Sequence, residues 1–105
     1  MKRIIIFASG SGSNAENIIK FFNKNKTAKV TQVLCNNKEA KVFERCKNLN
    51  VTCTYFNRKD FIETEVVLTI LKNNADFIVL AGFLWKIPAK IIETFPKRII
   101  NIHPA

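Results

Sequence analysis

The sequence predicts an open α/β fold, in which a parallel sheet carries helices on both faces. Short apolar runs rich in β-branched residues alternate along the chain with segments whose apolar residues recur at helical spacing. The apolar runs are nearly continuous, which is typical of strands that are buried on both faces. Strands alternating with helices give parallel pairs joined by right-handed crossovers, and 105 residues are sufficient for one small domain of this kind.

The first half of the chain accounts for three of the expected strands. Residues 3–9 form an apolar run that ends at Ser-Gly, and residues 14–25 then change to helical spacing through Ile18, Ile19, Phe21 and Phe22. Residues 30–35 and 51–56 have the composition of strands, and residues 39–49 between them are expected to form the second helix.

The second half of the chain continues the same alternation. Residues 61–72 carry apolar side chains at helical spacing and precede an apolar strand at residues 76–81. Pro88 opens a short helix at residues 89–95, because proline is favoured at the first helical position. Residues 98–102 are the last expected strand, and this strand is expected at an open edge of the sheet.

Composition excludes several classes of protein. The apolar stretch at residues 77–83 is far shorter than the ~18 residues of a membrane span, and the apolar run near the N-terminus is too short for a signal peptide. Cys35, Cys46 and Cys53 lack the paired spacing of a zinc site and are expected to be reduced thiols. We therefore expect a cytoplasmic protein with no metal and no membrane partner.

The chain is strongly basic, with 17 Lys and Arg against 8 Asp and Glu and a net charge of +9. Such an excess attracts anions, among them phosphates and nucleic acids. The lysines are spread along the chain without a dense run or an interleaved set of aromatic residues, so no specific nucleic-acid partner is expected.

A glycine-rich loop at residues 9–14, Ser-Gly-Ser-Gly-Ser-Asn, separates the first strand from the first helix. A helix start offers unpaired N–H groups and a positive dipole end, and glycine lets an oxyanion approach the backbone closely. Ser13 or Asn14 can add side-chain donors while capping the helix. The loop alone equally fits an ordinary glycine-rich turn.

The loop differs from two known nucleotide-binding motifs. Ala15 occupies the position of the third glycine in the dinucleotide fingerprint, and neither Asn36 nor Asn37 is the acidic residue expected after the second strand. No Gly-Lys-Ser/Thr follows, which excludes a P-loop. The loop fits a single phosphate better than a nicotinamide dinucleotide.

Asn101 and His103, the only histidine, lie two residues apart at the end of the last strand. Positions two apart on a strand face the same side, and Pro104 favours extended geometry at the residue before it. An amide donor beside an imidazole suits acyl or formyl transfer, in which a carbonyl oxygen becomes an oxyanion and an amine loses a proton. A histidine that merely closes the strand is the alternative.

These segments are expected to meet, because ligands of open α/β sheets bind beyond the carboxyl ends of the strands. The loops at residues 9–13, 36–37, 82–87 and 101–103 each follow an expected strand. The sequence therefore predicts one rim that carries all four.

Three motifs in this order resemble the phosphoribosylglycinamide formyltransferase family: residues 9–14, residues 79–84 (Val-Leu-Ala-Gly-Phe-Leu) and residues 101–104 (Asn-Ile-His-Pro). The resemblance covers the whole chain. It implies a Rossmann-like formyltransferase N-terminal domain that serves de novo purine biosynthesis. The implied reaction passes a formyl group from 10-formyltetrahydrofolate, as co-substrate, to the amine of glycinamide ribonucleotide without a metal.

The resemblance also implies roles for individual residues. The phosphate of the substrate would be bound by Gly12, Ser13 and Asn14, and the folate pocket would be lined by Leu84, Trp85, Lys86 and Ile87. Arg58 would be a basic folate contact, or Lys59 if the loop aligns one residue along. Asn101 would orient the formyl group of the cofactor, and His103 would be the catalytic imidazole.

Two residues differ from the pattern of the family, and one catalytic residue of the family is not found among these residues. Trp85 stands where many members carry arginine, and Ala105 replaces a serine. The catalytic aspartate of the family lies downstream of these residues. We therefore expect residues 1–105 to be a single N-terminal substrate-binding domain, inactive without the C-terminal half of the same enzyme. The alternatives are a related enzyme such as formyltetrahydrofolate deformylase, or a noncatalytic module that binds a phosphosugar or nucleotide.

Overall fold

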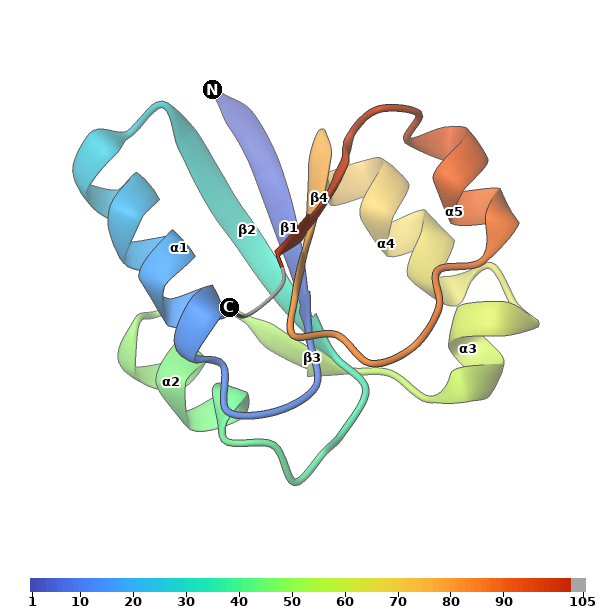
Figure 1. Cartoon of the computed structure of the whole chain (residues 1–105), viewed down its shortest axis with the longest axis horizontal. Coiled ribbons are helices and arrows are strands. Elements are labelled where there is room, and N and C mark those ends of the chain that lie inside the picture. Colours follow the sequence, from blue (N-terminus) through green and yellow to red (C-terminus); the bar gives the residue numbers. More distant parts are fainter. Residues whose placement is uncertain (103–105) are drawn as a thin grey trace.

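A five-stranded parallel sheet with the order β3-β2-β1-β4-β5 organises the chain in the computed structural model, which describes residues 1–102 (Figure 1). The strands are β1 Lys2–Ala8, β2 Ala28–Cys35, β3 Cys53–Tyr55, β4 Phe77–Ala81 and β5 Ile99–Ile102. The helices are α1 Ser13–Asn25, α2 Val42–Asn48, α3 Arg58–Ile62, α4 Val66–Asn74 and α5 Ala89–Thr94. The predicted fold class is confirmed.

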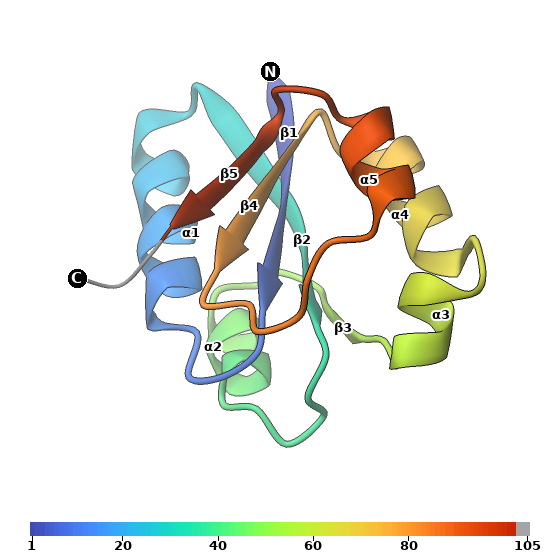
Figure 2. The ribbon, with the colours of Figure 1, turned by 45° about the vertical axis from the view of Figure 1, so that its right-hand side comes forward.

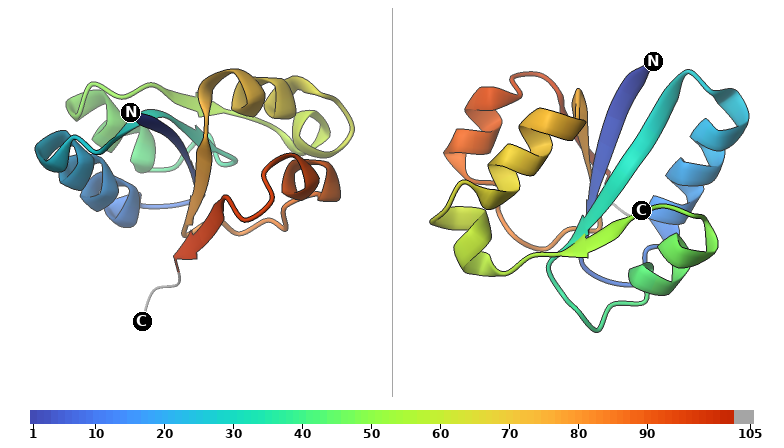
Figure 3. Two further views of the ribbon diagram at one scale, coloured as in Figure 1. Left: turned by 90° about the horizontal axis from the view of Figure 1, so that it is seen from above. Right: turned by 180° about the vertical axis from the view of Figure 1, so that it is seen from behind.

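Helices cover both faces of the sheet. In Figures 1 and 3, α1 and α2 lie on one side, and α3, α4 and α5 lie on the other. The central strand β1 supplies both cores, because Ile4 and Ile6 pack with the first pair of helices while Ile5 and Phe7 pack on the opposite face. This burial on both faces explains the continuous apolar run in the sequence. None of the helices in this described part is long and apolar enough to cross a membrane.

The strand order reverses beside β1, which has β2 on one side and β4 on the other. The chain leaves β1 toward α1 on one face and leaves β4 toward α5 on the other face (Figure 2). Such a switch point leaves a crevice between two loops at the carboxyl edge of a sheet. The candidate site is therefore expected between the loops that follow β1 and β4.

The single helix expected at residues 61–72 is wrong, because the structure has two helices there, α3 and α4. Thr64 ends the first helix: its hydroxyl donates to the Asp60 carbonyl at 3.2 Å and accepts from the Val66 N–H at 3.2 Å. The Lys90 ammonium also donates to the Thr64 carbonyl. Side-chain bonds of this kind compete with the helical backbone ladder, and the apolar spacing of the segment does not record them.

The second helix also begins later than expected, at Val42 rather than residue 39. The Asn37 side chain accepts a hydrogen bond from the Glu39 N–H at 3.0 Å, and the Asn37 carbonyl accepts from the Ala40 N–H at 3.0 Å. Asparagine readily forms such local turns. The turn carries the chain past the end of β2 before the helix begins.

An ion pair joins the beginnings of β1 and β4. The Arg3 guanidinium donates to both carboxylate oxygens of Asp76, at 3.3 and 3.2 Å, and the Arg3 backbone N–H donates to the same group at 2.8 Å. These bonds lower the pKa of Asp76 from 3.8 to about 2, with the side-chain bond as the larger cause.

We expect the Asp76 ion pair to make a small, acid-sensitive contribution to stability. A lowered carboxyl pKa stabilises the fold above the unfolded pKa and ceases to do so as the pH falls through the folded pKa. The difference in urea midpoint between the native chain and Asp76→Asn should therefore be present at pH 6 and disappear between about pH 4 and pH 2. Glu93→Gln, an exposed carboxylate on α5, is the control, and an equal pH profile for both variants would contradict the assignment.

Candidate functional site

The loops that follow β1 and β4 enclose a cavity of about 290 Å³ at the carboxyl edge of the sheet. Its lining consists of Gly10, Ser11, Gly12, Ser13, Asn14, Ala81 and Gly82. The buried hydroxyl of Ser9 accepts a hydrogen bond from the Leu84 N–H at 3.0 Å, which ties the two loops together. The sequence pattern does not predict this role for Ser9, because the Ser9–Leu84 contact joins residues far apart in the chain. The expected meeting of these two loops is confirmed.

Gly12 is the residue on which the shape of the first loop depends. Its φ of +79° lies in the left-handed region, and an added Cβ would stand 2.4 Å from Cγ2 of Val42. Both observations require glycine at this position. Gly12 is also the N-cap of α1, so the expectation that Ser13 or Asn14 caps the helix is wrong.

The start of α1 has the properties of an anion site. No side chain caps this helix within residues 1–102, although Ser11 Oγ accepts a long bond of 3.4 Å from the Ser13 N–H. The first N–H groups of a helix have no partner inside the helix, and its dipole places partial positive charge at the same end. The exposed Ser13 and half-buried Asn14 side chains stand beside these groups and line the cavity. The predicted residues Gly12, Ser13 and Asn14 thus all line one cavity, and their binding of a phosphate stays a prediction.

The loop between β4 and α5 is anchored by alternate residues. The rings of Phe83 and Trp85 pack against Phe61, with centroid distances of 5.7 and 6.0 Å, and Ile87 is buried. Leu84 between them is 83% exposed. The aromatic contacts hold the backbone of this loop against the sheet and leave Leu84 and Lys86 accessible to a ligand.

A second cavity, of about 420 Å³, adjoins this loop. Arg58, Lys86 and Ile87 are among its lining residues, and the Arg58 guanidinium lies 5.4 Å from the centre of the Trp85 ring. Three of the six residues predicted to contact the folate, Arg58, Lys86 and Ile87, therefore line one cavity, and Trp85 lies against Arg58. Leu84 and Asn101 do not line it. Lys59, the alternative to Arg58, is exposed and does not line this cavity.

The end of β5 lies beside the end of β4. Asn101 pairs with Leu80, and Ile102 pairs with Ala81, a residue that lines the first cavity. The exposed Asn101 therefore stands at the same carboxyl edge as the glycine-rich loop. His103 lies outside the described residues, so its role stays a prediction from the sequence.

Metal ligands are not gathered in the described residues. Within residues 1–102, no group of three or more His, Cys, Asp or Glu side chains is placed to hold a metal ion. The three cysteines are free thiols, with Cys35 and Cys46 buried.

A doubly wound parallel sheet with a glycine-rich loop at its switch point defines a Rossmann-like α/β protein, and the carboxyl edge at this loop is where such folds bind their ligands. Residues 2–105 match the sequence model of the formyl transferase family, and the chain belongs to this family.

Individual relatives agree with this assignment. The chain is 30% identical over 111 residues to phosphoribosylglycinamide formyltransferase of Bacillus subtilis, an alignment that covers 100% of this chain and 57% of that protein. The corresponding enzyme of Haemophilus influenzae is 32% identical, with 100% and 52% covered. Glycinamide ribonucleotide transformylase 1 of Geobacillus kaustophilus superposes with a TM-score of 0.89 at 34% identity, covering 99% of this chain and 58% of that one. The chain thus spans about half the length of these relatives.

Proposed function

We propose that this chain is the N-terminal, substrate-binding half of a phosphoribosylglycinamide formyltransferase, which formylates the amine of glycinamide ribonucleotide in purine synthesis. The observation that carries this proposal is the cavity of about 290 Å³ between the Gly12 loop and the end of β4. It combines a helix start with a glycine that no other residue can replace without strain. Relatives that carry this activity by name align over the whole chain.

The proposed roles follow from where each group stands. Gly12, Ser13 and Asn14 hold the phosphate of the ribonucleotide, while the folate lies against Arg58 and the loop of Leu84, Trp85, Lys86 and Ile87. The folate is 10-formyltetrahydrofolate, which supplies the formyl group as a co-substrate.

The chemistry requires two groups, Asn101 in β5 and His103, which follows this strand in the sequence. The amine nitrogen attacks the formyl carbon, the carbonyl oxygen becomes an oxyanion, and the bond to the folate nitrogen breaks as a proton moves from the amine to that nitrogen. Asn101 donates a hydrogen bond to the formyl oxygen, and protonated His103 stabilises the oxyanion. The family aspartate that raises the histidine pKa would come from the C-terminal half, so residues 1–105 alone are inactive.

The outer side of β5 is where we place the C-terminal half. An apolar hollow of about 370 Å³ adjoins β5 on the face of the sheet that α1 covers, and its lining includes Ile18, Val79, Ile100 and Ile102. Ile100 is 53% exposed, and β5 is an edge strand of the described sheet (Figure 2). Exposed apolar edge strands need a covering segment, and the relatives have roughly as many further residues to provide one. Free cysteines support a cytoplasmic setting for this enzyme.

Binding of glycinamide ribonucleotide by this chain tests the proposal directly. Calorimetry should show saturable one-to-one binding, because the phosphate cavity is built entirely from residues of this chain. A single-stranded oligonucleotide at equal phosphate concentration is the comparison, since the net charge of +9 attracts any polyanion. Binding of the ribonucleotide should survive an increase in salt that removes the oligonucleotide. Preference for the oligonucleotide would exclude the proposed function.

A further inference from the structure

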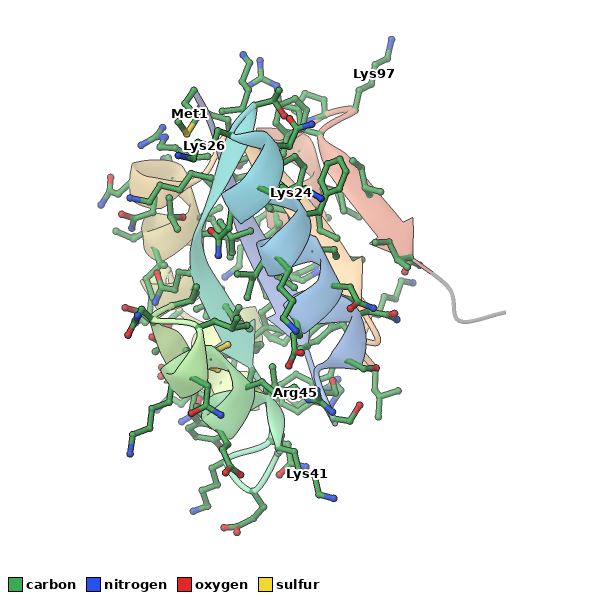
Figure 4. The ribbon with its side chains drawn as sticks, turned by 90° about the vertical axis from the view of Figure 1, so that its left-hand side faces the viewer. Met1, Lys24, Lys26, Lys41, Arg45 and Lys97 are labelled. Carbon is green, nitrogen blue, oxygen red and sulfur yellow. The ribbon has the colours of Figure 1, made fainter. Side chains whose placement is uncertain are left out.

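Two groups of helix α2 donate hydrogen bonds to backbone carbonyls of the glycine-rich loop. Helix α2 itself plays no part in the proposed binding of substrate. The Val42 N–H donates to the Gly10 carbonyl at 3.2 Å, and Arg45 Nε donates to the Ser11 carbonyl at 2.6 Å. Figure 4 shows Arg45 between α2 and the start of α1. Both bonds join residues more than 30 positions apart in sequence, and the Arg45 bond spans 34 positions.

The two bonds fix two consecutive peptide planes. In a trans peptide the carbonyl and the following N–H point in opposite directions, because the unit is planar. A Gly10 carbonyl held by α2 therefore turns the Ser11 N–H away from α2, and a Ser11 carbonyl held by Arg45 turns the Gly12 N–H the same way. Successive N–H groups that point to one side form an anion-binding concavity. Ser11 and Gly12 both line the cavity, whereas Arg45 does not.

Arg45 also pairs with the carboxylate in the first turn of α1. Its Nη1 lies 2.9 Å from Oε1 of Glu16, in the first turn of α1, and Lys20 Nζ lies 2.8 Å from Oε2. Hydrogen bonds from Lys20 and then from Arg45 lower the pKa of Glu16. A bare carboxylate at this place would repel a bound phosphate, so the two cations offset its charge.

We propose that Arg45 is a positioning residue for the anion site: it orients the Ser11–Gly12 peptide toward the cavity and neutralises Glu16, without touching the ligand. The inference rests on the proposed function, because it assigns the oriented N–H groups to the phosphate of the ribonucleotide. Lysine cannot substitute fully, since a single ammonium cannot reproduce the fixed fork that reaches Ser11 and Glu16 together.

Steady-state kinetics of the enzyme with both halves present tests Arg45. In Arg45→Met, KM for glycinamide ribonucleotide should rise roughly 10- to 100-fold, the loss expected for a hydrogen bond from a charged group. Both kcat and KM for the folate should stay within about 2-fold. Arg45→Lys should be intermediate. Lys41→Met is the matched control, because it removes an exposed cation from the N-cap of the same helix without touching the loop.

Further variants separate the two parts of the role. Adding Glu16→Gln to Arg45→Met removes the repelling charge but leaves the peptide unheld, so KM should recover only in part. Equal effects of Lys41→Met and Arg45→Met, or full rescue by Arg45→Lys, would overturn the positioning role, because net charge alone would then explain the result. If Arg45→Met unfolds at too low a temperature to be assayed, Arg45→Lys tests the role instead, because it keeps the charge and the aliphatic stem. The measurement is again its KM for glycinamide ribonucleotide. Failure of the unmutated protein to bind the ribonucleotide would instead refute the proposed function.

Discussion

A Gly12→Ala variant is expected to lose at least ~10-fold in affinity for glycinamide ribonucleotide and to melt at a lower temperature. A side chain at φ +79° costs on the order of 1–3 kcal/mol, and the new Cβ would meet Val42 at 2.4 Å from Cγ2, 2.6 Å from Cβ and 2.9 Å from Cα. Because the nearest atoms include backbone, rotation of the valine cannot relieve the overlap. Either the loop or α2 must shift, and either movement displaces the N–H groups that line the cavity.

Two further variants make this result specific. Gly10→Ala should melt like the native chain, because a Cβ there meets nothing within 4 Å. Adding Val42→Ala to Gly12→Ala removes the closest atom but leaves Cβ and Cα in place, so recovery should be partial. Calorimetry and thermal melting of the three variants give the comparison. Native affinity in Gly12→Ala would disprove the assignment of the loop as the phosphate site.

A His103→Ala variant is expected to lower kcat by roughly 10²- to 10⁴-fold in the enzyme with both halves present, the range for loss of a general acid or base. Binding of glycinamide ribonucleotide should hardly change, because the proposed phosphate site is the start of α1 and does not include His103. Asn101→Ala should lower kcat by roughly 10²- to 10³-fold, as for loss of one oxyanion donor.

Single-turnover measurements separate these losses from slow product release, and calorimetry reports the binding step. Lys97→Ala is the control, because this exposed residue precedes β5 at the opposite end of the strand from Asn101. Turnover close to that of the native enzyme in His103→Ala would remove the catalytic role. A parallel loss of ribonucleotide binding would instead point to a structural role for the histidine.

The sequence alone determined the order of the strands, the class of the sheet and the position of the glycine-rich loop, and it determined every helix except the division of residues 61–72 into two. Local patterns predict each of these features. Continuous apolar runs indicate buried strands, helical spacing indicates helices, and the Ser-Gly repeat marks the loop after the first strand. The meeting of the loops after β1 and β4 followed from the general rule for such sheets. The end of the chain could be interpreted chemically because an amide and an imidazole lie two residues apart.

The tertiary structure decided what local patterns do not record. The division of residues 61–72 depends on bonds from Thr64 and from Lys90, which lies on a different helix. Residue 12 must be glycine because Val42 packs against it, and the proposed orientation of the loop depends on Arg45. The partners in the last two contacts lie 30 or more residues apart in sequence. Which side chains fill the space beside a loop is settled only when the sheet brings them together, so the sequence located the site while packing between distant segments gave it its shape.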